Sequence, residues 1–393
     1  MAWDELTPEQ RELRDLVRTL ARERIAPRAA EIDASHEFPW DVVELFREHD
    51  IFALLFEERY GGTGTGTLMY LIAMEEVAKV CATSNLIMGA QELGSLGLKL
   101  AGTGEQKDQW LPRLASGESL CAYALTEAGS GSDSAAMRTT ARRDGDEYLL
   151  NGSKRFITNA SVASLYTVFA KTDPSAGHSG ISAFVVEADA PGFQVTRLEP
   201  KMGISGSTTG ELAFDDCRIP AANLLGAEGE GFKIAMRILD RSRPGVAAQA
   251  LGIAQGATDY ALDYAKTRET MGKPIAQHQL IQAKLADMET ECEAARGLLY
   301  RFGRMVDDGA DDAELTKASA MAKLKCGDVA MAVTTEAVQI LGGYGYIKEY
   351  PVERFMRDAK ITQIYEGTQE IQRLVIAREM VKESRAFLLA GVS

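Results

Sequence analysis

The chain has 393 residues, of which 46% are hydrophobic and 25% charged, and its formal net charge is -14 at pH 7. This length exceeds what one hydrophobic core usually serves, so two or three packed domains are expected. The composition is globular, no apolar run approaches the roughly 20 residues of a membrane-spanning helix, and the negative charge disfavours binding to nucleic-acid phosphates.

The N-terminus, the cysteines and the histidines bear on compartment and metals. Residues 1–8 lack the basic and apolar regions of a secretory signal. The 5 cysteines are scattered and include no C-x-x-C pair, which predicts reduced thiols and a cytoplasmic protein. The 4 histidines show no metal-ligand spacing, so no metal site is predicted.

Residues 7 to about 114 have a helical pattern. It opens with Thr7-Pro8-Glu9-Gln10, in which Thr7 suits the cap, Pro8 the first turn and Gln10 a capping box. The run Gly61-Gly62-Thr63-Gly64-Thr65-Gly66 interrupts the pattern. Such a loop is able to cradle phosphate, but no β-rich run leads into it, which favours a plain connector.

The character of the chain changes twice after this helical part. Between about Cys121 and Arg218, short β-branched or aromatic runs alternate with turns such as Asn151-Gly152, the rhythm of a small antiparallel barrel or sandwich. From Gly231 onward, long segments rich in Ala, Met and Leu predict a helical bundle. The predicted domains are 1–120 (helical), 121–232 (β) and 233–393 (helical), in an α+β protein that is mainly α.

Glu366 is the first candidate for chemistry. Thr368 is placed to cap a helix whose apolar face begins at Ile371, so Glu366 lies just outside the helix start, where a carboxylate is stabilised. On this spacing alone, a surface acid near a positive helix end is the simpler interpretation.

Two further segments could contact a ligand. The loop Tyr123 to Asp133 is rich in small and hydroxyl residues that let a backbone approach a ligand, although it also fits an ordinary loop. In the strand that follows Asn151-Gly152, Phe156 and Thr158 lie on one face by period two, which suits a flat heteroaromatic ring. Phe156 could equally belong to the core.

Together these segments match one family in order and spacing. The chain resembles the acyl-CoA dehydrogenases over essentially its whole length. The matching segments are Tyr123-Ala-Leu-Thr-Glu-Ala-Gly-Ser-Gly-Ser-Asp133, Gly152-Ser-Lys-Arg-Phe-Ile-Thr-Asn159, Leu239-Asp-Arg-Ser-Arg-Pro244, Arg268-Glu-Thr-Met-Gly-Lys-Pro-Ile275, Gln339-Ile-Leu-Gly-Gly-Tyr-Gly345, Tyr350-Pro351 with Arg357-Asp-Ala-Lys360, and Ile364-Tyr-Glu-Gly-Thr368.

The resemblance implies an N-terminal helical domain, a middle antiparallel β-barrel and a C-terminal four-helix bundle. It implies FAD held between the β domain, the bundle and a neighbouring subunit, so a dimer is the minimum working unit and a homotetramer is common. The implied reaction is α,β-dehydrogenation of an acyl-CoA thioester to a trans-2-enoyl-CoA, with hydride transfer to flavin N5. Electron-transferring flavoprotein is the implied acceptor, and the implied role is in fatty acid or amino acid catabolism such as β-oxidation.

The resemblance also assigns roles to single residues, beginning with Glu366 as the base that removes the α-proton. The implied FAD contacts are Tyr123, Leu125, Thr126, Ser132, Phe156, Thr158, Arg268, Gln279, Gln339, Gly342, Gly343, Thr368 and Glu370. The implied substrate contacts are Ser132, Asp240, Arg243 and Gly367. Of the FAD contacts, Arg268 and Gln279 resemble residues that bind the pyrophosphate and adenosine, and the segment Gln339 to Gly343 resembles a turn closing over the dinucleotide of the partner subunit.

Some positions depart from the family pattern or stay open. Phe156 stands where most relatives have Trp, and Glu370 where Gln is often found. The pair Asp240 and Arg243 could instead be a salt bridge on a helix surface. Residues 88–92 fall where relatives line the deep end of the acyl pocket, and the sequence does not show which of them point inward.

Two other functions were weighed. An acyl-CoA oxidase would let oxygen reach the reduced flavin, but the chain is short for the common oxidase type. A flavin-containing relative that binds nucleic acid would need a basic face, and the extreme C-terminus, residues 381–393, offers little sign of one. We therefore expect an enzyme that binds neither nucleic acid nor membrane.

Overall fold

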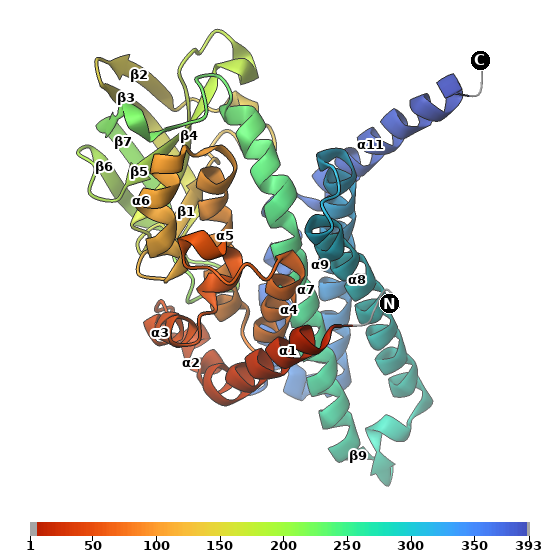
Figure 1. Cartoon of the computed structure of the whole chain (residues 1–393). Coiled ribbons are helices and arrows are strands. Elements are labelled where there is room, and N and C mark those ends of the chain that lie inside the picture. The colour runs from red at the N-terminus through yellow and green to blue at the C-terminus, as the bar shows by residue number, and fades with distance from the viewer. Residues whose placement is uncertain (1–5, 391–393) are drawn as a thin grey trace.

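The computed structural model describes residues 6–390, with side chains up to residue 382. Residues 1–5, part of the stretch on which the expectation of no secretory signal rests, lie outside the described residues. A β-sheet lies beside a column of long helices, and α11 projects away from the body of the molecule (Figure 1). The division of the chain at 120 and 232 stays a prediction.

The N-terminal part is helical, as predicted. Its helices are α1 (Pro8–Leu20), α2 (Ala29–Ser35), α3 (Trp40–Glu48), α4 (Thr67–Ala78), α5 (Ala82–Ala101) and α6 (Gly104–Ala115). The capping box is confirmed, because the Thr7 hydroxyl accepts from the Gln10 backbone N–H and the Gln10 side chain accepts from that of Thr7. The glycine-rich loop leads into α4, whose first two N–H groups donate to the Asp307 carboxylate at 2.6 and 3.1 Å. They are not available to a phosphate.

The middle part forms an open sheet. Its strands are β1 (Cys121–Ala124), β2 (Thr140–Asp144), β3 (Glu147–Thr158), β4 (Leu165–Lys171), β5 (Ile181–Glu187), β6 (Phe193–Leu198), β7 (Thr209–Pro220) and β8 (Leu224–Leu225). The order is β6-β7-β3-β2-β4-β5-β8, with β1 on β4, and the β1–β4 and β2–β4 pairs are parallel.

The expectation of a closed antiparallel barrel is not confirmed. Within residues 6–390 the end strands β6 and β8 do not pair with each other, so the sheet is not closed. The alternation of strand and turn signals along the sequence predicts where strands lie in the chain. Closure depends on strand tilt and register, which that alternation does not specify.

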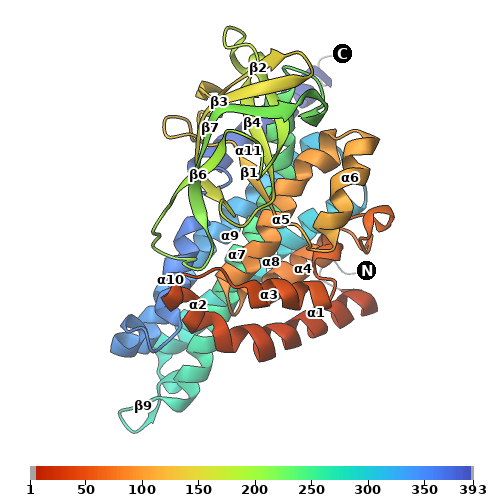
Figure 2. The ribbon, with the colours of Figure 1, turned by 90° about the vertical axis from the view of Figure 1, so that its left-hand side faces the viewer.

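The C-terminal part is helical, as predicted. Its elements are α7 (Gly231–Thr267), the β9–β10 hairpin (Glu269–Thr270 and Lys273–Pro274), α8 (Gln279–Asp307), α9 (Asp312–Leu341), α10 (Val352–Ile361) and α11 (Gln369–Ala390). Helix α9 packs against α7, α8 and α11, and the hairpin lies at the opposite end of the molecule from the sheet (Figure 2). Among the described residues, no helix is long and apolar enough to cross a membrane.

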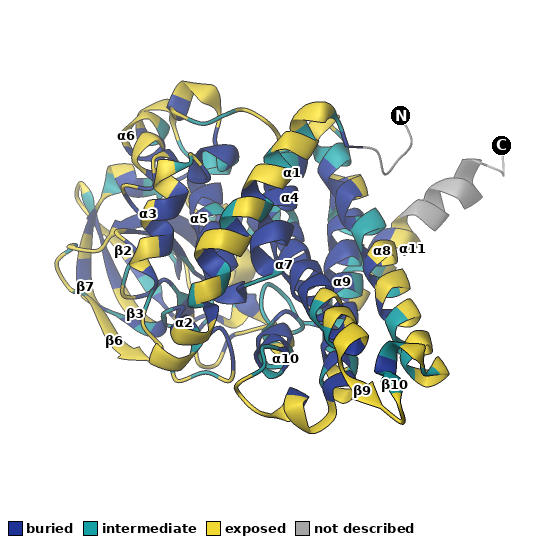
Figure 3. Cartoon of the chain, turned by 90° about the horizontal axis from the view of Figure 1, so that it is seen from below, coloured by how far each residue is buried: buried dark blue, intermediate teal, exposed yellow. Residues whose placement is uncertain are grey.

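Helix α7 crosses the core and joins the other parts. It contacts α4, α5, α8, α9 and β5, and most of its length is dark blue in the burial view, whereas the hairpin is exposed (Figure 3). Small residues at the contacts make this close approach possible. A Cβ at Gly252 would lie 2.4 Å from the Glu75 carbonyl oxygen of α4, so a larger residue would force the two helices apart.

A buried acid links α4 to α8. The Glu75 carboxylate accepts from Arg296 at 2.8 Å and from the Tyr300 hydroxyl at 2.8 Å, and Lys79 lies 3.5 Å away. Burial raises the pKa of Glu75, but Arg296 and Lys79 outweigh it and hold that pKa below its usual range. The charge is therefore retained inside the core.

Arg296→Met should lower the free energy of unfolding by about 3 kcal/mol, because removing one partner of a buried pair leaves an uncompensated charge, and Lys79 only partly replaces it. Urea unfolding measures the loss. As a control, Lys266→Met removes the exposed pair with Asp263 and should cost less than about 1 kcal/mol. A loss in Arg296→Met no larger than in the control would contradict this prediction.

Candidate active site

Glu366 lies in the short connection between α10 and α11. Its φ is 52° and that of Gly367 is 94°, so two successive residues occupy the left-handed region. The Ser242 hydroxyl of α7 donates to the Glu366 carboxylate at 2.5 Å. A non-glycine residue at such a φ stores strain and persists only where its surroundings hold it, which is a common property of functional sites.

Arg243 holds the backbone of this connection. The residue is 3% exposed, and its guanidinium donates from Nε to the Glu366 carbonyl oxygen at 3.3 Å. The same group donates to Asp240 at 2.6 Å, and Asp240 also accepts from Thr316 at 2.7 Å. Asp240 and Arg243 therefore form a salt bridge, but a largely buried one beside Glu366 and not one on a helix surface. Their contact with the substrate stays a prediction.

Burial and the neighbouring polar groups have opposite effects on the pKa of Glu366. Burial raises the pKa of Glu366, and the hydrogen bond from Ser242 and the charges of Arg243 and Lys323 oppose this rise. A carboxylate with a raised pKa is a stronger base than one in water. The carboxyl group is thus suited to accept a proton from a weakly acidic bond.

The side of the site beyond Ser242 is lined by α4 and α5. Gly245 lies one turn along α7 from Ser242, and a Cβ there would meet the Tyr70 hydroxyl at 3.0 Å and the Glu92 carboxylate at 3.3 Å. Among residues 88–92, Glu92 therefore faces the site. Gln91 faces away, since its side-chain amide donates to the Leu114 and Ser119 carbonyl oxygens at 2.9 Å.

The predicted flavin contacts of the β domain come together. The Arg155 N–H donates to the Thr126 carbonyl oxygen at 2.8 Å, which joins the loop after β1 to strand β3 beside Phe156. Beneath this junction, the buried Lys154 donates to the Leu125 carbonyl oxygen at 3.2 Å and to Glu127 at 2.8 Å. Burial and the nearby Glu366 raise the pKa of the Tyr123 hydroxyl, and Arg243 opposes this rise, so this wall adjoins the carboxylate.

Phe156 is exposed because of a bulge in β3, and not because it shares a strand face with Thr158. The period-two argument places Phe156 and Thr158 on one face, but β3 has a bulge between Lys154 and Ile157 and Phe156 has a φ of 61°. The ring is 57% exposed, whereas Thr158 is partly buried. Phe156 is not a core residue, because the bulge turns it outward.

A third group of predicted residues lies elsewhere. Arg268, Gly342 and Gly343 line a cavity of about 450 Å³ near the β9–β10 hairpin. Gln279 and Gln339 are exposed and do not line it. Arg243 and Arg268 are about 25 residues apart along α7, which at about 1.5 Å per residue separates them by about 37 Å.

The remaining predicted residues lie around the Glu366 connection or in the loop after β1. The Thr368 hydroxyl accepts from the Ile371 N–H at 3.3 Å, so the predicted cap is confirmed. Glu370 is exposed in the first turn of α11, where backbone N–H groups lower its pKa. Ser132 is exposed in the loop after β1.

Ser242, Lys323 and Tyr70 were missed by the sequence analysis. The first two contact the Glu366 connection from other helices, at separations of 124 and 44 residues. No local pattern marks them. Ser242 does lie in the segment Leu239 to Pro244 that matches the family, but nothing in that segment marks it as a contact of Glu366.

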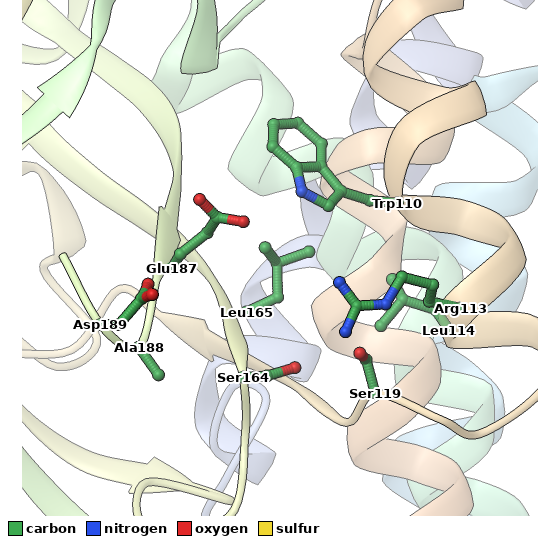
Figure 4. Close-up of a pocket in the computed structure, with 9 residues that line it drawn as sticks. All are labelled: Trp110, Arg113, Leu114, Ser119, Ser164, Leu165, Glu187, Ala188 and Asp189. Atoms are coloured by element: carbon green, nitrogen blue, oxygen red, sulfur yellow. The ribbon is translucent and has the colours of Figure 1, made fainter.

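A second cavity lies away from this site. It has a volume of about 300 Å³ and separates α6 from the ends of β4 and β5, with Trp110, Arg113 and Glu187 among its lining (Figure 4). None of the predicted site residues lines it.

Family models match three successive parts of the chain. They are the N-terminal, middle and C-terminal domains of acyl-CoA dehydrogenase, at residues 7–118, 122–217 and 229–381.

Individual proteins match along nearly the whole length. The chain is 47% identical over 378 residues to cyclohexane-1-carbonyl-CoA dehydrogenase of Geobacter metallireducens, covering 96% of this chain and 98% of that one. Butyryl-CoA dehydrogenase of Megasphaera elsdenii has a TM-score of 0.93 at 44% identity, covering 96% and 99% of the two chains. A chain in a structure of the electron transferring flavoprotein of Acidaminococcus fermentans has a TM-score of 0.94 at 46% identity, covering 96% and 99%. The chain therefore belongs to the acyl-CoA dehydrogenase family and is an FAD-dependent oxidoreductase that dehydrogenates acyl-CoA thioesters.

Proposed function

We propose that Glu366 is the base that removes the α-proton of the acyl thioester. The observation that supports this most strongly is the carboxylate on a strained connection, held by Ser242 and flanked by Arg243. The α-C–H bond of a thioester is only weakly acidic, so a positioned base has to act while the carbonyl is polarised.

The backbone N–H of Glu366 is the proposed donor to the thioester carbonyl oxygen. In the part of the chain that the structure describes, this N–H has no acceptor, whereas the Glu366 carbonyl oxygen accepts from Arg243. A donor fixed by the fold gains strength as negative charge develops on the oxygen, and it needs no rearrangement during the reaction. Asp240, Arg243, Gly367 and Ser132 are the proposed contacts of the CoA thioester.

The residues of the β domain fit a flavin ring. The exposed ring of Phe156 lies beside the Thr126 backbone, and the buried Tyr123 hydroxyl has no partner in residues 6–390. When bound, FAD takes the β-hydrogen as hydride, which leaves the trans-2-enoyl product. We assign Leu125, Thr158, Thr368 and Glu370 to the same flavin site.

The cavity at Arg268 fits the other end of the dinucleotide. An arginine fork suits pyrophosphate, and added Cβ atoms at Gly342 and Gly343 would meet nothing within 4 Å, so the backbone there faces open space. This cavity lies about 37 Å along α7 from Arg243, far from the wall proposed for the flavin ring. It would therefore hold the FAD of a neighbouring subunit, together with Gln279 and Gln339.

We therefore infer a homo-oligomer, a dimer or a dimer of dimers. Exposed apolar side chains gather near the hairpin and after α9, including Met271 at 94% and Tyr346 at 84% exposure. Such side chains are unfavourable in water and are typical of an interface.

We propose a compact acyl group for the substrate. Tyr70 and Glu92 approach α7 at Gly245, so their side chains would stand in the way of a long acyl chain that extended beyond Glu366. The relatives named for butyryl-CoA and cyclohexane-1-carbonyl-CoA support this class. A panel of acyl-CoA thioesters, read by loss of flavin absorbance, tests it, and a preference for long chains would contradict it.

Electron-transferring flavoprotein is the proposed acceptor. The support is the likeness to a chain in a structure of such a flavoprotein. Faster reoxidation by oxygen than by that flavoprotein would instead favour an oxidase. All five cysteines are free and buried, which is compatible with the cytoplasm.

Glu366→Gln keeps the shape of the side chain and removes its basic lone pair. The variant should bind FAD and acyl-CoA nearly normally, and substrate should reduce its flavin about 10²- to 10⁴-fold more slowly. Anaerobic stopped-flow absorbance measures the rate. Glu105→Gln, an exposed acid in the first turn of α6, is the matched control. Reduction of Glu366→Gln at the rate of the control would remove Glu366 from the role of base.

Arg268→Ala should weaken FAD binding, because an arginine–phosphate hydrogen bond contributes about 1.5 to 3 kcal/mol. Flavin released during equilibrium dialysis measures the affinity. Arg142→Ala removes an exposed arginine of β2 and should leave the affinity unchanged. Equal FAD affinities of the two variants would exclude Arg268 from the site.

A further inference from the structure

Lys323 of α9 brings a positive charge beneath the Glu366 connection. The side chain is 0% exposed, and its ammonium group donates to the Gly367 carbonyl oxygen at 2.7 Å and to the Gln369 side chain at 3.1 Å. Among the described residues, it forms no salt bridge with a carboxylate. Burying an ammonium group removes its hydration, so a buried lysine with such partners needs a reason.

The charged surroundings of Lys323 include the proposed base. The charges of Glu366, Asp328 and Glu370 raise the pKa of Lys323, and that of Arg243 lowers it. The titratable groups facing Glu366 are Arg243, Lys323, Glu92, Tyr70, Tyr123 and Tyr365. Burial lowers the pKa of Lys323 to about 7, and Glu366 gives the strongest opposing effect.

We propose that Lys323 is a positioning residue for Glu366, which fixes the Gly367 carbonyl group and keeps the adjacent carboxyl group ionised. The inference rests on the proposed role of Glu366. An opposite charge nearby favours the charged form of a carboxyl group. The two left-handed residues of the connection also need external contacts, and Lys323 supplies one that α7 does not.

The direction of the pH effect follows from this arrangement. A base accepts a proton only when it is ionised, so the rate of flavin reduction rises with pH through the pKa of Glu366. Without the charge of Lys323 that pKa rises, and the acidic limb of the rate profile moves to higher pH. Above a pH of about 7 Lys323 itself loses its charge, so wild type and variant should converge there.

Three variants separate the charge of Lys323 from its hydrogen bond to Gly367 and from the effect of removing any lysine of α9. Lys323→Met removes the charge and the donor at nearly constant length. Lys323→Gln removes the charge but retains an N–H donor for the Gly367 carbonyl. Lys325→Met removes the same charge from the same helix, at a partly exposed position where Lys325 pairs with Glu291. Each is loaded with FAD, and its flavin reduction by a reactive acyl-CoA is followed anaerobically in a pH series that extends to both sides of the pKa of Lys323, about 7.

At pH values below the limb, reduction should be about tenfold slower or more in Lys323→Met and Lys323→Gln, since a shift of one unit in the limb corresponds to tenfold in rate. The rates should approach that of wild type at high pH, and Lys325→Met should follow wild type throughout. A loss by the same factor at every pH would show a merely structural role and overturn the inference. Failure of both Lys323 variants to fold and bind FAD would also overturn it, because Lys323 would then serve the core.

Glu366→Gln in the same pH series keeps the two claims apart. If the remaining rate of Glu366→Gln still rises with pH over the same range as in wild type, that rise does not report the ionisation of Glu366, and the proposed base is wrong. If the rise of the rate with pH is lost in Glu366→Gln but occurs at the wild-type pH in Lys323→Met, only the role proposed for Lys323 is wrong.

Discussion

The proposed site depends on one constraint, which is that a buried carboxyl group on a strained connection has to be held in place and ionised. Glu366 has a positive φ and is drawn toward the neutral form by burial. Ser242 and Arg243 of α7 and Lys323 of α9 oppose both tendencies. Because these groups lie on two helices, the close packing of α7 against α9 is part of the chemistry as well as of the core.

Helix α7 contacts the proposed base and also leads to the cavity that would hold the FAD of a neighbouring subunit. Helix α7 carries Ser242 and Arg243 near one end of the site and leads to Arg268 about 37 Å away. Arg268 of the same chain therefore lies far from the Glu366 wall. This separation supports the proposal that two chains complete each flavin site, in which each chain supplies a ring-binding wall to one FAD and a pyrophosphate-binding wall to another.

Local chemistry could be predicted from the sequence, and contacts between distant segments could not. The caps at Thr7 and Thr368 depend on residues three positions away, and both are present. The ordered motifs predicted the family. Ser242 and Lys323 carry no local signal because their partners are far along the chain. The bulge at Phe156 and the open sheet depend on register, which alternation of residue types leaves unspecified.

The most direct test of the central claim separates proton removal from oxidation. An acyl-CoA thioester with sulfur in place of the β-carbon has α-hydrogens but no β-hydrogen to transfer. In deuterium oxide the wild-type protein should exchange these α-hydrogens, detected by mass spectrometry, at least about 10²-fold faster than Glu366→Gln. Equal exchange by the two proteins would show that another group removes the proton, and would contradict this account of the site.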